Sequence, residues 1–120
     1  MIKYHDTIEQ GSDSWMALRC GKLTASEMKF IVTPTLKVAD NDKSRTHLWE
    51  LLAQRITGYV EPQYISDDML RGKVDEVEAK ILYNQHIAPT KDMGFITNSK
   101  WGFTLGYSPD ALVGDDGVIE

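Results

Sequence analysis

The sequence predicts an α/β fold of the α+β kind, in which helices come first and a β-sheet follows. Apolar residues recur every three to four positions over much of the chain up to residue 86, which is the period of a helix with one buried face. After Pro89 the pattern changes to short β-prone runs separated by turns rich in Gly, Asn and Asp. A chain of 120 residues supports one hydrophobic core and is too short for two, so we expect a single domain.

Two short helices are expected near the N-terminus. The first spans residues 12–19, where the Ser12 hydroxyl can accept a hydrogen bond from a free backbone N–H of the first turn. Gly21 suits the left-handed conformation in which helices often end. The second helix begins at Thr24, because Thr24 and Glu27 have the spacing of a capping box.

Residues 35–43 are polar and are expected to form a loop between the second helix and two longer ones. The third helix spans 44–57 and is followed by Gly58, which favours a left-handed C-terminal cap. The fourth spans 66–86, with Ser66 as its N-cap. Its buried stripe is expected to consist of four apolar residues at helical spacing, Leu70, Val74, Val77 and Ile81.

The remaining residues are expected to form strands. The predicted strands cover four segments, 94–97, 101–107, 111–113 and 118–120. A turn at 98–100 separates the first two, and the glycines of the segment 114–117 suit a tight turn between the last two. Three aromatic side chains are expected in the core, Trp15, Trp49 and Phe95, with Trp15 also bracing the segment around Arg19.

Composition narrows the class of protein. Residues 1–10 lack the apolar segment of a signal peptide, and no apolar run approaches the roughly 20 residues that span a bilayer. The single cysteine, Cys20, cannot form an internal disulfide, and we interpret it as a buried structural thiol. The three histidines lack the spacing of zinc ligands. We therefore expect a cytoplasmic protein without a membrane partner.

Charge is unevenly distributed along the chain. The net charge of −5 argues against a protein that binds nucleic acid through phosphate contacts alone. Residues 1–60 carry eight basic and seven acidic residues, whereas residues 61–120 carry five basic and eleven acidic ones. The acidic half fits a metal-dependent nuclease, which must gather carboxylates, but a solvated acidic surface explains most of these charges equally well.

Two carboxylates near the end of the sequence are candidate metal ligands. Asp110 and Glu120 flank a short strand, a turn and a second strand, so that pairing of the strands would bring both carboxylates to one end of a hairpin. Mg²⁺ and Mn²⁺ prefer oxygen ligands of this kind. Taken alone, this spacing also fits an aspartate beside a turn and a glutamate on the surface.

The long helix 66–86 offers a third carboxylate, Glu76. Four residues fall on one helical face that differs from the apolar stripe, Gly72, Glu76, Ala79 and Tyr83. The two small residues of this face leave space around Glu76. A solvated helix glutamate is the alternative interpretation.

Three ordered blocks of the chain carry a specific pattern. They are residues 9–26, which contain EQGSDSW and LTAS, residues 71–83 of the long helix, and residues 106–120, GYSPDALVGDDGVIE. Together they resemble the lambda exonuclease and YqaJ-type viral recombinase family, which belongs to the PD-(D/E)XK nucleases. In this resemblance Pro109-Asp110 is the PD pair, and Glu120 is the glutamate that opens E-X-K.

The resemblance implies a restriction-endonuclease-like core with N-terminal helices and a mixed β-sheet. It implies that Asp110 is the central ligand of Mg²⁺ or Mn²⁺, with Glu120 and Glu76 as further catalytic carboxylates. Bound carboxylates and metal would neutralise the scissile phosphate and activate the attacking water. The lysine of E-X-K would be residue 122, so we expect the fold to be incomplete at its C-terminus and the 120-residue chain to be inactive as a nuclease.

The resemblance also implies a site for the 5′-phosphate of a DNA end. Arg19, Ser26 and Ser108 match family residues that hold this group. Ser26 is expected in the first turn of a helix, where unpaired N–H groups favour an anion, and Arg19 can add a bidentate contact. Residues 1–60 would then form the helical 5′-phosphate-binding region, and residues 61–120 the long helix and the active-site hairpin. The alternative interpretation is that Arg19 is an ordinary surface arginine and Ser26 an ordinary serine at the start of a helix.

The function implied by the resemblance is a metal-dependent 5′→3′ exonuclease that acts on ends of double-stranded DNA in phage-type homologous recombination. The family also implies a ring-shaped homotrimer, a single-strand annealing protein as partner, and the cytoplasm of a bacterial or phage-infected cell. Two alternatives stay open. One is a non-catalytic remnant of a decayed prophage exonuclease that binds DNA ends or another protein, and the other is a restriction-type endonuclease with the same core.

Overall fold

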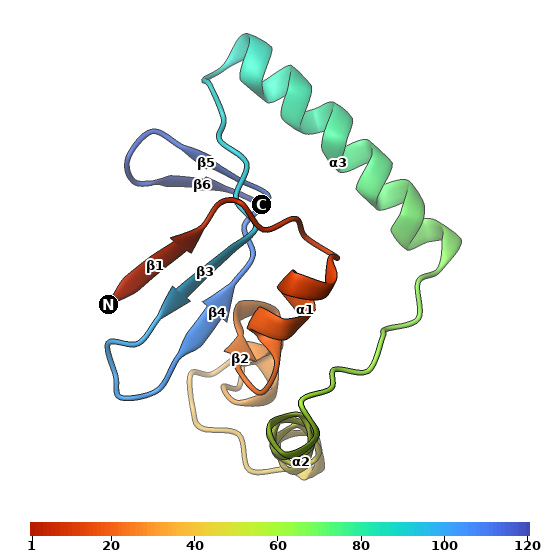
Figure 1. Ribbon diagram of the computed structural model, residues 1–120, viewed down its shortest axis with the longest axis vertical. Helices are drawn as coiled ribbons and strands as arrows, with labels where there is room; N and C mark the ends of the chain where they lie inside the picture. The colour runs from red at the N-terminus through yellow and green to blue at the C-terminus, as the bar shows by residue number, and fades with distance from the viewer.

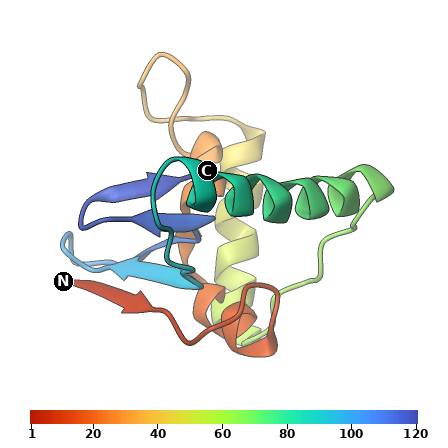
Figure 2. The ribbon, with the colours of Figure 1, turned by 90° about the horizontal axis from the view of Figure 1, so that it is seen from above.

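The computed structural model describes residues 1–120 and confirms the α/β fold class. Strands gather on one side of the molecule and helices on the other (Figures 1 and 2). The elements are, in chain order, β1 (Ile2–His5), α1 (Asp13–Arg19), β2 (Leu23–Thr24), the 3₁₀ helix η1 (Ala25–Phe30), α2 (Asp42–Thr57), α3 (Asp67–His86), β3 (Phe95–Asn98), β4 (Leu105–Tyr107), β5 (Ala111–Val113) and β6 (Gly117–Ile119).

A four-stranded mixed sheet forms the centre of the fold, in the order β1-β3-β4-β2. Strands β1, β3 and β4 pair antiparallel, whereas β2 lies parallel to β4. Strands β5 and β6 form a separate antiparallel hairpin, which an isolated bridge between Lys91 and Leu112 joins to the segment before β3. Residues 108–110 connect the sheet to this hairpin, so both parts of the β-structure position them (Figure 1).

Two strands of this sheet were absent from the sequence-based prediction. Strand β1 is an edge strand with three exposed residues, and its alternation of apolar and polar side chains covers only four residues, the shortest run that can indicate a strand. Strand β2 has only two residues, which is below the length at which a pattern is visible. Both strands exist because β3 and β4 offer them backbone partners from distant parts of the chain.

Helix ends follow the local capping rules, with one correction. The hydroxyls of Ser12 and Ser66 accept hydrogen bonds from the first turns of α1 and α3, as predicted. Helix α2 begins at Asp42, before the predicted start at Ser44. Asn41 caps it, because the Ser44 N–H donates to Asn41 Oδ1 at 2.9 Å and the Asn41 N–H donates to Ser44 Oγ at 3.2 Å.

The capping box predicted at Thr24 is wrong. Residues Ala25–Phe30 form a 3₁₀ helix, and the Thr24 side chain makes no capping bond to its backbone. The Thr24 hydroxyl instead donates to Glu27 Oε2 at 3.2 Å and lies 3.3 Å from Ser26 Oγ. The threonine and glutamate side chains therefore bind each other directly instead of capping the helix backbone.

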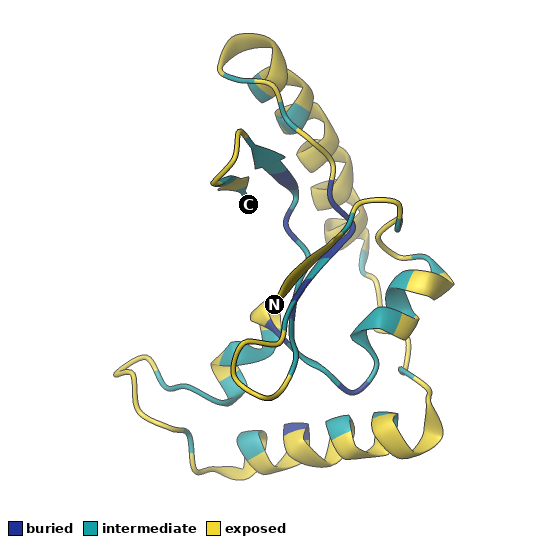
Figure 3. Ribbon diagram, turned by 60° about the vertical axis from the view of Figure 1, so that its left-hand side comes forward, coloured by how far each residue is buried: buried dark blue, intermediate teal, exposed yellow.

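The predicted buried stripe of α3 is exposed. Its four apolar residues, Leu70, Val74, Val77 and Ile81, are between 50% and 68% exposed, and Figure 3 shows most of the helix coloured as exposed. Trp49 on α2, expected in the core, is also exposed. The core lies instead in the β-region, where Phe95, Pro109 and Ala111 are fully buried. None of the helices has the length and apolar character that crossing a membrane requires.

Replacing Gly94 by alanine is expected to lower the free energy of unfolding by about 1–3 kcal/mol. A Cβ atom at Gly94 would collide with the backbone of Ile8 and approach the carbonyl oxygen of His5, and backbone cannot move aside cheaply. Gly72→Ala is the matched control, because its Cβ atom would meet open space on helix α3. This variant should raise the free energy of unfolding by about 0.5–1 kcal/mol. Urea unfolding measures both, and a Gly94→Ala variant as stable as Gly72→Ala would contradict this packing.

Candidate active site

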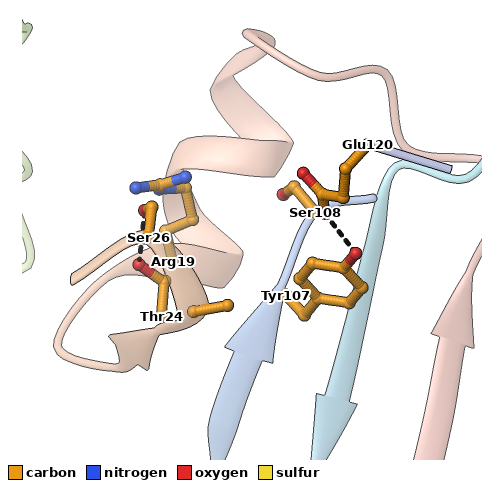
Figure 4. A pocket seen from close by; sticks show the side chains of 7 residues that line it. Arg19, Thr24, Ser26, Tyr107, Ser108 and Glu120 are labelled. Atoms are coloured by element: carbon orange, nitrogen blue, oxygen red, sulfur yellow. Dashed lines mark hydrogen bonds between the residues drawn. The ribbon is translucent and has the colours of Figure 1, made fainter. Parts of the chain in front are cut away.

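An open pocket of about 430 Å³ lies where α1, η1 and the end of β4 meet. Its seven lining residues are Arg19, Thr24, Ala25, Ser26, Tyr107, Ser108 and Glu120 (Figure 4). The structure therefore brings together all three residues proposed to hold a 5′-phosphate, although 82 positions separate Ser26 from Ser108 in the sequence. Their role in binding phosphate stays a prediction.

Trp15 connects two of these residues. The Arg19 guanidinium lies 4.3 Å from the centroid of the Trp15 ring, and Trp15 Nε1 donates to Ser108 Oγ at 2.9 Å. Trp15 thus braces the Arg19 segment, as the sequence suggested, and it also orients the Ser108 hydroxyl. Burial lowers the pKa of Arg19, and the negative charge of Glu27 opposes this shift. A partly buried guanidinium beside hydroxyl groups is well suited to bind an oxyanion.

Ser26 lies at the start of η1, as predicted, but the physical reason is different. The helix has only six residues in 3₁₀ geometry, so its dipole adds little to anion binding. The Thr24 and Ser26 hydroxyls, which lie 3.3 Å apart, are the polar groups that this segment offers to the pocket. Affinity for an anion here would come from Arg19 and the hydroxyls rather than from the helix terminus.

Glu76 and Asp110 form a second part of the site. Partial burial raises the pKa of Glu76, and the charge of Asp110 and a hydrogen bond with it raise that pKa further, while Lys80 and Lys73 lower it. Lys80 Nζ donates to the Asp110 carbonyl oxygen at 3.3 Å and pairs with Asp92 at 3.0 Å. The bond from Lys80 to Asp110 therefore links α3 to the start of the β5–β6 hairpin, with Glu76 near the Asp110 carboxylate.

Glu120 turns toward the pocket rather than toward this pair. Its carboxylate accepts a short hydrogen bond from the Tyr107 hydroxyl. Burial, the bond to Glu120 and the charges of Glu120 and Asp110 raise the pKa of Tyr107 to about 12. The structure thus brings Glu76 and Asp110 together, but it does not gather them with Glu120 into one group of three possible metal ligands.

The hairpin itself behaves as the sequence predicted. Ala111 pairs with Ile119 and Val113 with Gly117, and the Asp110 N–H donates to the Ile119 carbonyl oxygen at 3.1 Å. Gly114 has the left-handed φ of 60° that the turn requires. Asp110 and Glu120 consequently leave the open end of the same hairpin on neighbouring strands.

Sequence reasoning missed two groups that shape the site. Tyr107 and Thr24 line the pocket, and although both lie within the matched blocks, neither was assigned a functional role. Gln10 lies outside it, but its side-chain amide donates to the carbonyl oxygens of Met93 at 3.0 Å and Pro109 at 2.9 Å. Gln10 belongs to the EQGSDSW block, so its presence there was the one available signal that the N-terminal segment holds Pro109-Asp110 in place.

Glu76→Gln is expected to raise the melting temperature at neutral pH in the absence of metal. Because the pKa of Glu76 is higher in the folded state than in the unfolded state, the folded state binds more protons at pH values between the two. The free energy of unfolding therefore falls as the pH rises from the unfolded pKa through the folded one. The glutamine variant escapes this loss, and its advantage disappears at acidic pH, where Glu76 is neutral. Glu78→Gln on the same helix is the control. Melting curves across acidic to neutral pH that coincide for both variants would contradict the Glu76–Asp110 interaction.

No protein-family model and no curated protein matches the chain, but solved structures do. An alkaline exonuclease, LHK-Exo from Laribacter hongkongensis, is 28% identical with a TM-score of 0.69, and the alignment covers 91% of this chain and 52% of that one. The structure of LHK-Exo in complex with dAMP gives 33% identity, a TM-score of 0.71 and the same coverage. The protein therefore has the fold of a PD-(D/E)XK-type exonuclease, over about half the length of the exonucleases to which it is similar.

Proposed function

We propose that the protein acts on the ends of double-stranded DNA as a metal-dependent 5′→3′ exonuclease, and that it hydrolyses phosphodiester bonds with water as the nucleophile. The observation that carries the proposal is the pocket that unites Arg19, Ser26 and Ser108 next to the Glu76–Asp110 pair. One subsite has cationic and hydroxyl donors, and the other has two carboxylates. A terminal phosphate and a catalytic metal ion require this combination.

The terminal 5′-phosphate would bind in the pocket. Arg19 would donate two hydrogen bonds to its oxygens, and the Ser26 and Ser108 hydroxyls would donate one each. Trp15 supports this geometry, because it stacks on Arg19 and holds Ser108. With the 5′ end fixed, the first phosphodiester bond would lie toward the neighbouring carboxylates, so that cleavage starts at the terminus.

The Glu76–Asp110 pair fits a divalent cation. The neighbouring Asp110 carboxylate raises the pKa of Glu76, and a hard divalent cation between the two carboxylates would relieve this repulsion. Bound Mg²⁺ or Mn²⁺ would neutralise the scissile phosphate and lower the pKa of the attacking water. Lys80 would hold the backbone of Asp110 in place through its bond to the carbonyl oxygen. Glu120, which lines the pocket, would complete the catalytic carboxylates from the other strand of the hairpin.

The similar structures support the class of product in one respect. LHK-Exo is an alkaline exonuclease, and one of its structures holds dAMP, a deoxynucleoside monophosphate. Stepwise hydrolysis of a DNA end releases mononucleotides of this chemical class. A role in phage-type recombination, a ring-shaped homotrimer, an annealing-protein partner and a cytoplasmic location are further parts of the proposal, and they rest on the family resemblance alone.

Digestion of end-labelled duplex DNA tests this function. With Mg²⁺ or Mn²⁺, a chain that includes the lysine of E-X-K should release mononucleotides from 5′-phosphorylated ends faster than from 5′-hydroxyl ends, and chelation should stop the reaction. The 120 residues alone are expected to bind such ends without digesting them. A preference for 3′ ends would contradict the proposal, and cuts within a closed circular duplex would favour a restriction-type endonuclease instead.

A second candidate is a DNA-end-binding protein without hydrolytic activity. The observation that favours it is the position of Glu120, which bonds to Tyr107 and faces the phosphate pocket instead of the Glu76–Asp110 pair. Binding of 5′-phosphorylated ends without mononucleotide release in either metal would support this candidate. The same digestion experiment, combined with a binding measurement, separates the two functions.

A further inference from the structure

The turn at residues 20–22 joins two parts of the phosphate pocket. Arg19, which precedes it, is the last residue of α1, whereas Thr24 and Ser26, which follow it, belong to β2 and η1. All three lie on the same side of the pocket (Figure 4). The Lys22 N–H donates to the Arg19 carbonyl oxygen at 3.0 Å and closes the turn. The position of the Arg19 guanidinium relative to the Ser26 hydroxyl therefore depends on how this turn is held.

Gly21, at the centre of this turn, is held by side chains of α2. It is buried and has a left-handed φ of 67°. Its N–H donates to Gln54 Oε1 at 2.9 Å, and its carbonyl oxygen accepts from Arg55 Nε at 2.8 Å. Neither group has a backbone partner. Because buried backbone groups need a hydrogen-bond partner, the turn depends on these two adjacent side chains.

Two further observations show how closely α2 approaches the turn. The Cys20 Sγ atom donates to the Gln54 carbonyl oxygen at 3.2 Å. A Cβ atom at Gly21 would collide with Arg55 Cγ, so the left-handed backbone and the close approach both require glycine here. Helix α2 contributes no residue to the lining of the pocket, but it fixes this turn from outside.

We propose that Gln54 and Arg55 are positioning residues for the phosphate pocket. By holding both polar groups of Gly21, they keep Arg19 at the distance from Ser26 that a terminal phosphate requires. The inference rests on the proposed function, because it concerns the same pocket. Charge-assisted hydrogen bonds from a guanidinium to a phosphate have donor–acceptor distances of about 2.7–2.9 Å, so a small displacement of Arg19 weakens them. An end with a 5′-hydroxyl group offers no dianion to Arg19, and its binding should not depend on the turn.

The test measures binding of a blunt duplex with 5′-phosphate or 5′-hydroxyl ends, by fluorescence anisotropy without metal. The preference is the ratio of the two dissociation constants. Gln54→Leu removes the acceptor of the Gly21 N–H and should reduce the preference about three- to tenfold, which is part of the contribution of one charge-assisted contact. Gln54→Glu keeps a side-chain oxygen as acceptor and should retain the preference within about twofold. A role in stability alone predicts lower melting temperatures with an unchanged preference in the folded protein.

Two further single variants accompany this comparison. Arg55→Met removes the donor to the Gly21 carbonyl oxygen but keeps an apolar stem beside it, so it should also reduce the preference. It decides the question if Gln54→Leu does not fold. Gln85→Leu is the matched control, because it makes the same substitution at an exposed residue of α3 and should leave the preference intact.

A double variant shows whether the turn acts through Arg19. In a chain with Arg19→Ala, the addition of Gln54→Leu should change the remaining preference little, because the guanidinium that the turn positions is gone. Three results overturn the inference while the proposed function stands: an equal reduction with and without Arg19, an equal loss in Gln54→Glu, or an unchanged preference in Gln54→Leu (in Arg55→Met, where the former does not fold). A lack of preference in the unmodified protein refutes the proposed function, and the inference falls with it.

Discussion

Asp110→Asn will abolish metal binding, and in a chain that includes the lysine of E-X-K it will also abolish metal-dependent DNA hydrolysis, while the affinity for DNA ends is kept. The substitution exchanges a charged ligand for a neutral one of nearly the same shape, so the fold around the hairpin should persist. Loss of an outer-shell partner of a metal site typically costs about ten- to a hundredfold in affinity or activity, and loss of a direct ligand should cost more. The phosphate pocket is a separate subsite, which leaves end binding intact.

Binding of Mn²⁺ followed by electron paramagnetic resonance measures this effect without depending on the rate of hydrolysis. Asp115→Asn is the control, because it removes an equal charge from the exposed turn between β5 and β6. The unmodified protein and Asp115→Asn should bind Mn²⁺, and Asp110→Asn should not. Mn²⁺ affinity that survives in Asp110→Asn would remove Asp110 as the central ligand.

Arg19→Ala will reduce the affinity for 5′-phosphorylated ends by roughly ten- to a hundredfold. A hydrogen bond to a charged group contributes about 1.5–3 kcal/mol, and only the phosphorylated end offers the terminal dianion. The variant also removes the cation that stacks on Trp15 and faces Ser26 and Ser108. The duplex with 5′-hydroxyl ends should bind almost as before.

Arg45→Ala is the matched control for this substitution. Arg45 is a surface residue that pairs with Asp40 and Asp42 and does not line the pocket. Its loss should affect both duplexes slightly and equally, as a general reduction of positive charge. If Arg19→Ala also weakens both duplexes equally, Arg19 contributes to general DNA affinity or to folding rather than to recognition of the 5′-phosphate.

Local hydrogen-bond chemistry explains which parts of the fold could be predicted from the sequence. Ser12 and Ser66 cap helices, and Gly58 and Gly114 adopt left-handed conformations, because each depends on residues within one turn of the chain. At Thr24 the same rule failed. The threonine and glutamate had the spacing of a capping box, but the Glu27 carboxylate accepts the Thr24 hydroxyl and lies 3.3 Å from His47 Nε2 of α2, and the segment winds as a 3₁₀ helix.

Non-local contacts account for the rest. The pairing of β1 with β3 joins Ile2 to Asn98, which no local pattern encodes. Helical periodicity in α3 correctly indicated a helix, but it does not state what covers its apolar stripe, and Val74 on that stripe is exposed. The grouping of Arg19 with Ser108 came from the family resemblance and not from spacing, and the structure brings them together through β4 and Trp15.

The central claim is that one end of the β-sheet holds two adjacent subsites, one for a terminal phosphate and one for a metal ion. Crystallographic analysis of the protein with Mn²⁺ and a 5′-phosphorylated duplex tests it most directly, because anomalous scattering locates the metal independently of the DNA. We predict manganese between Glu76 and Asp110, and the terminal phosphate against Arg19, Ser26 and Ser108. Manganese bound elsewhere, or a terminal phosphate outside the pocket, would contradict this account.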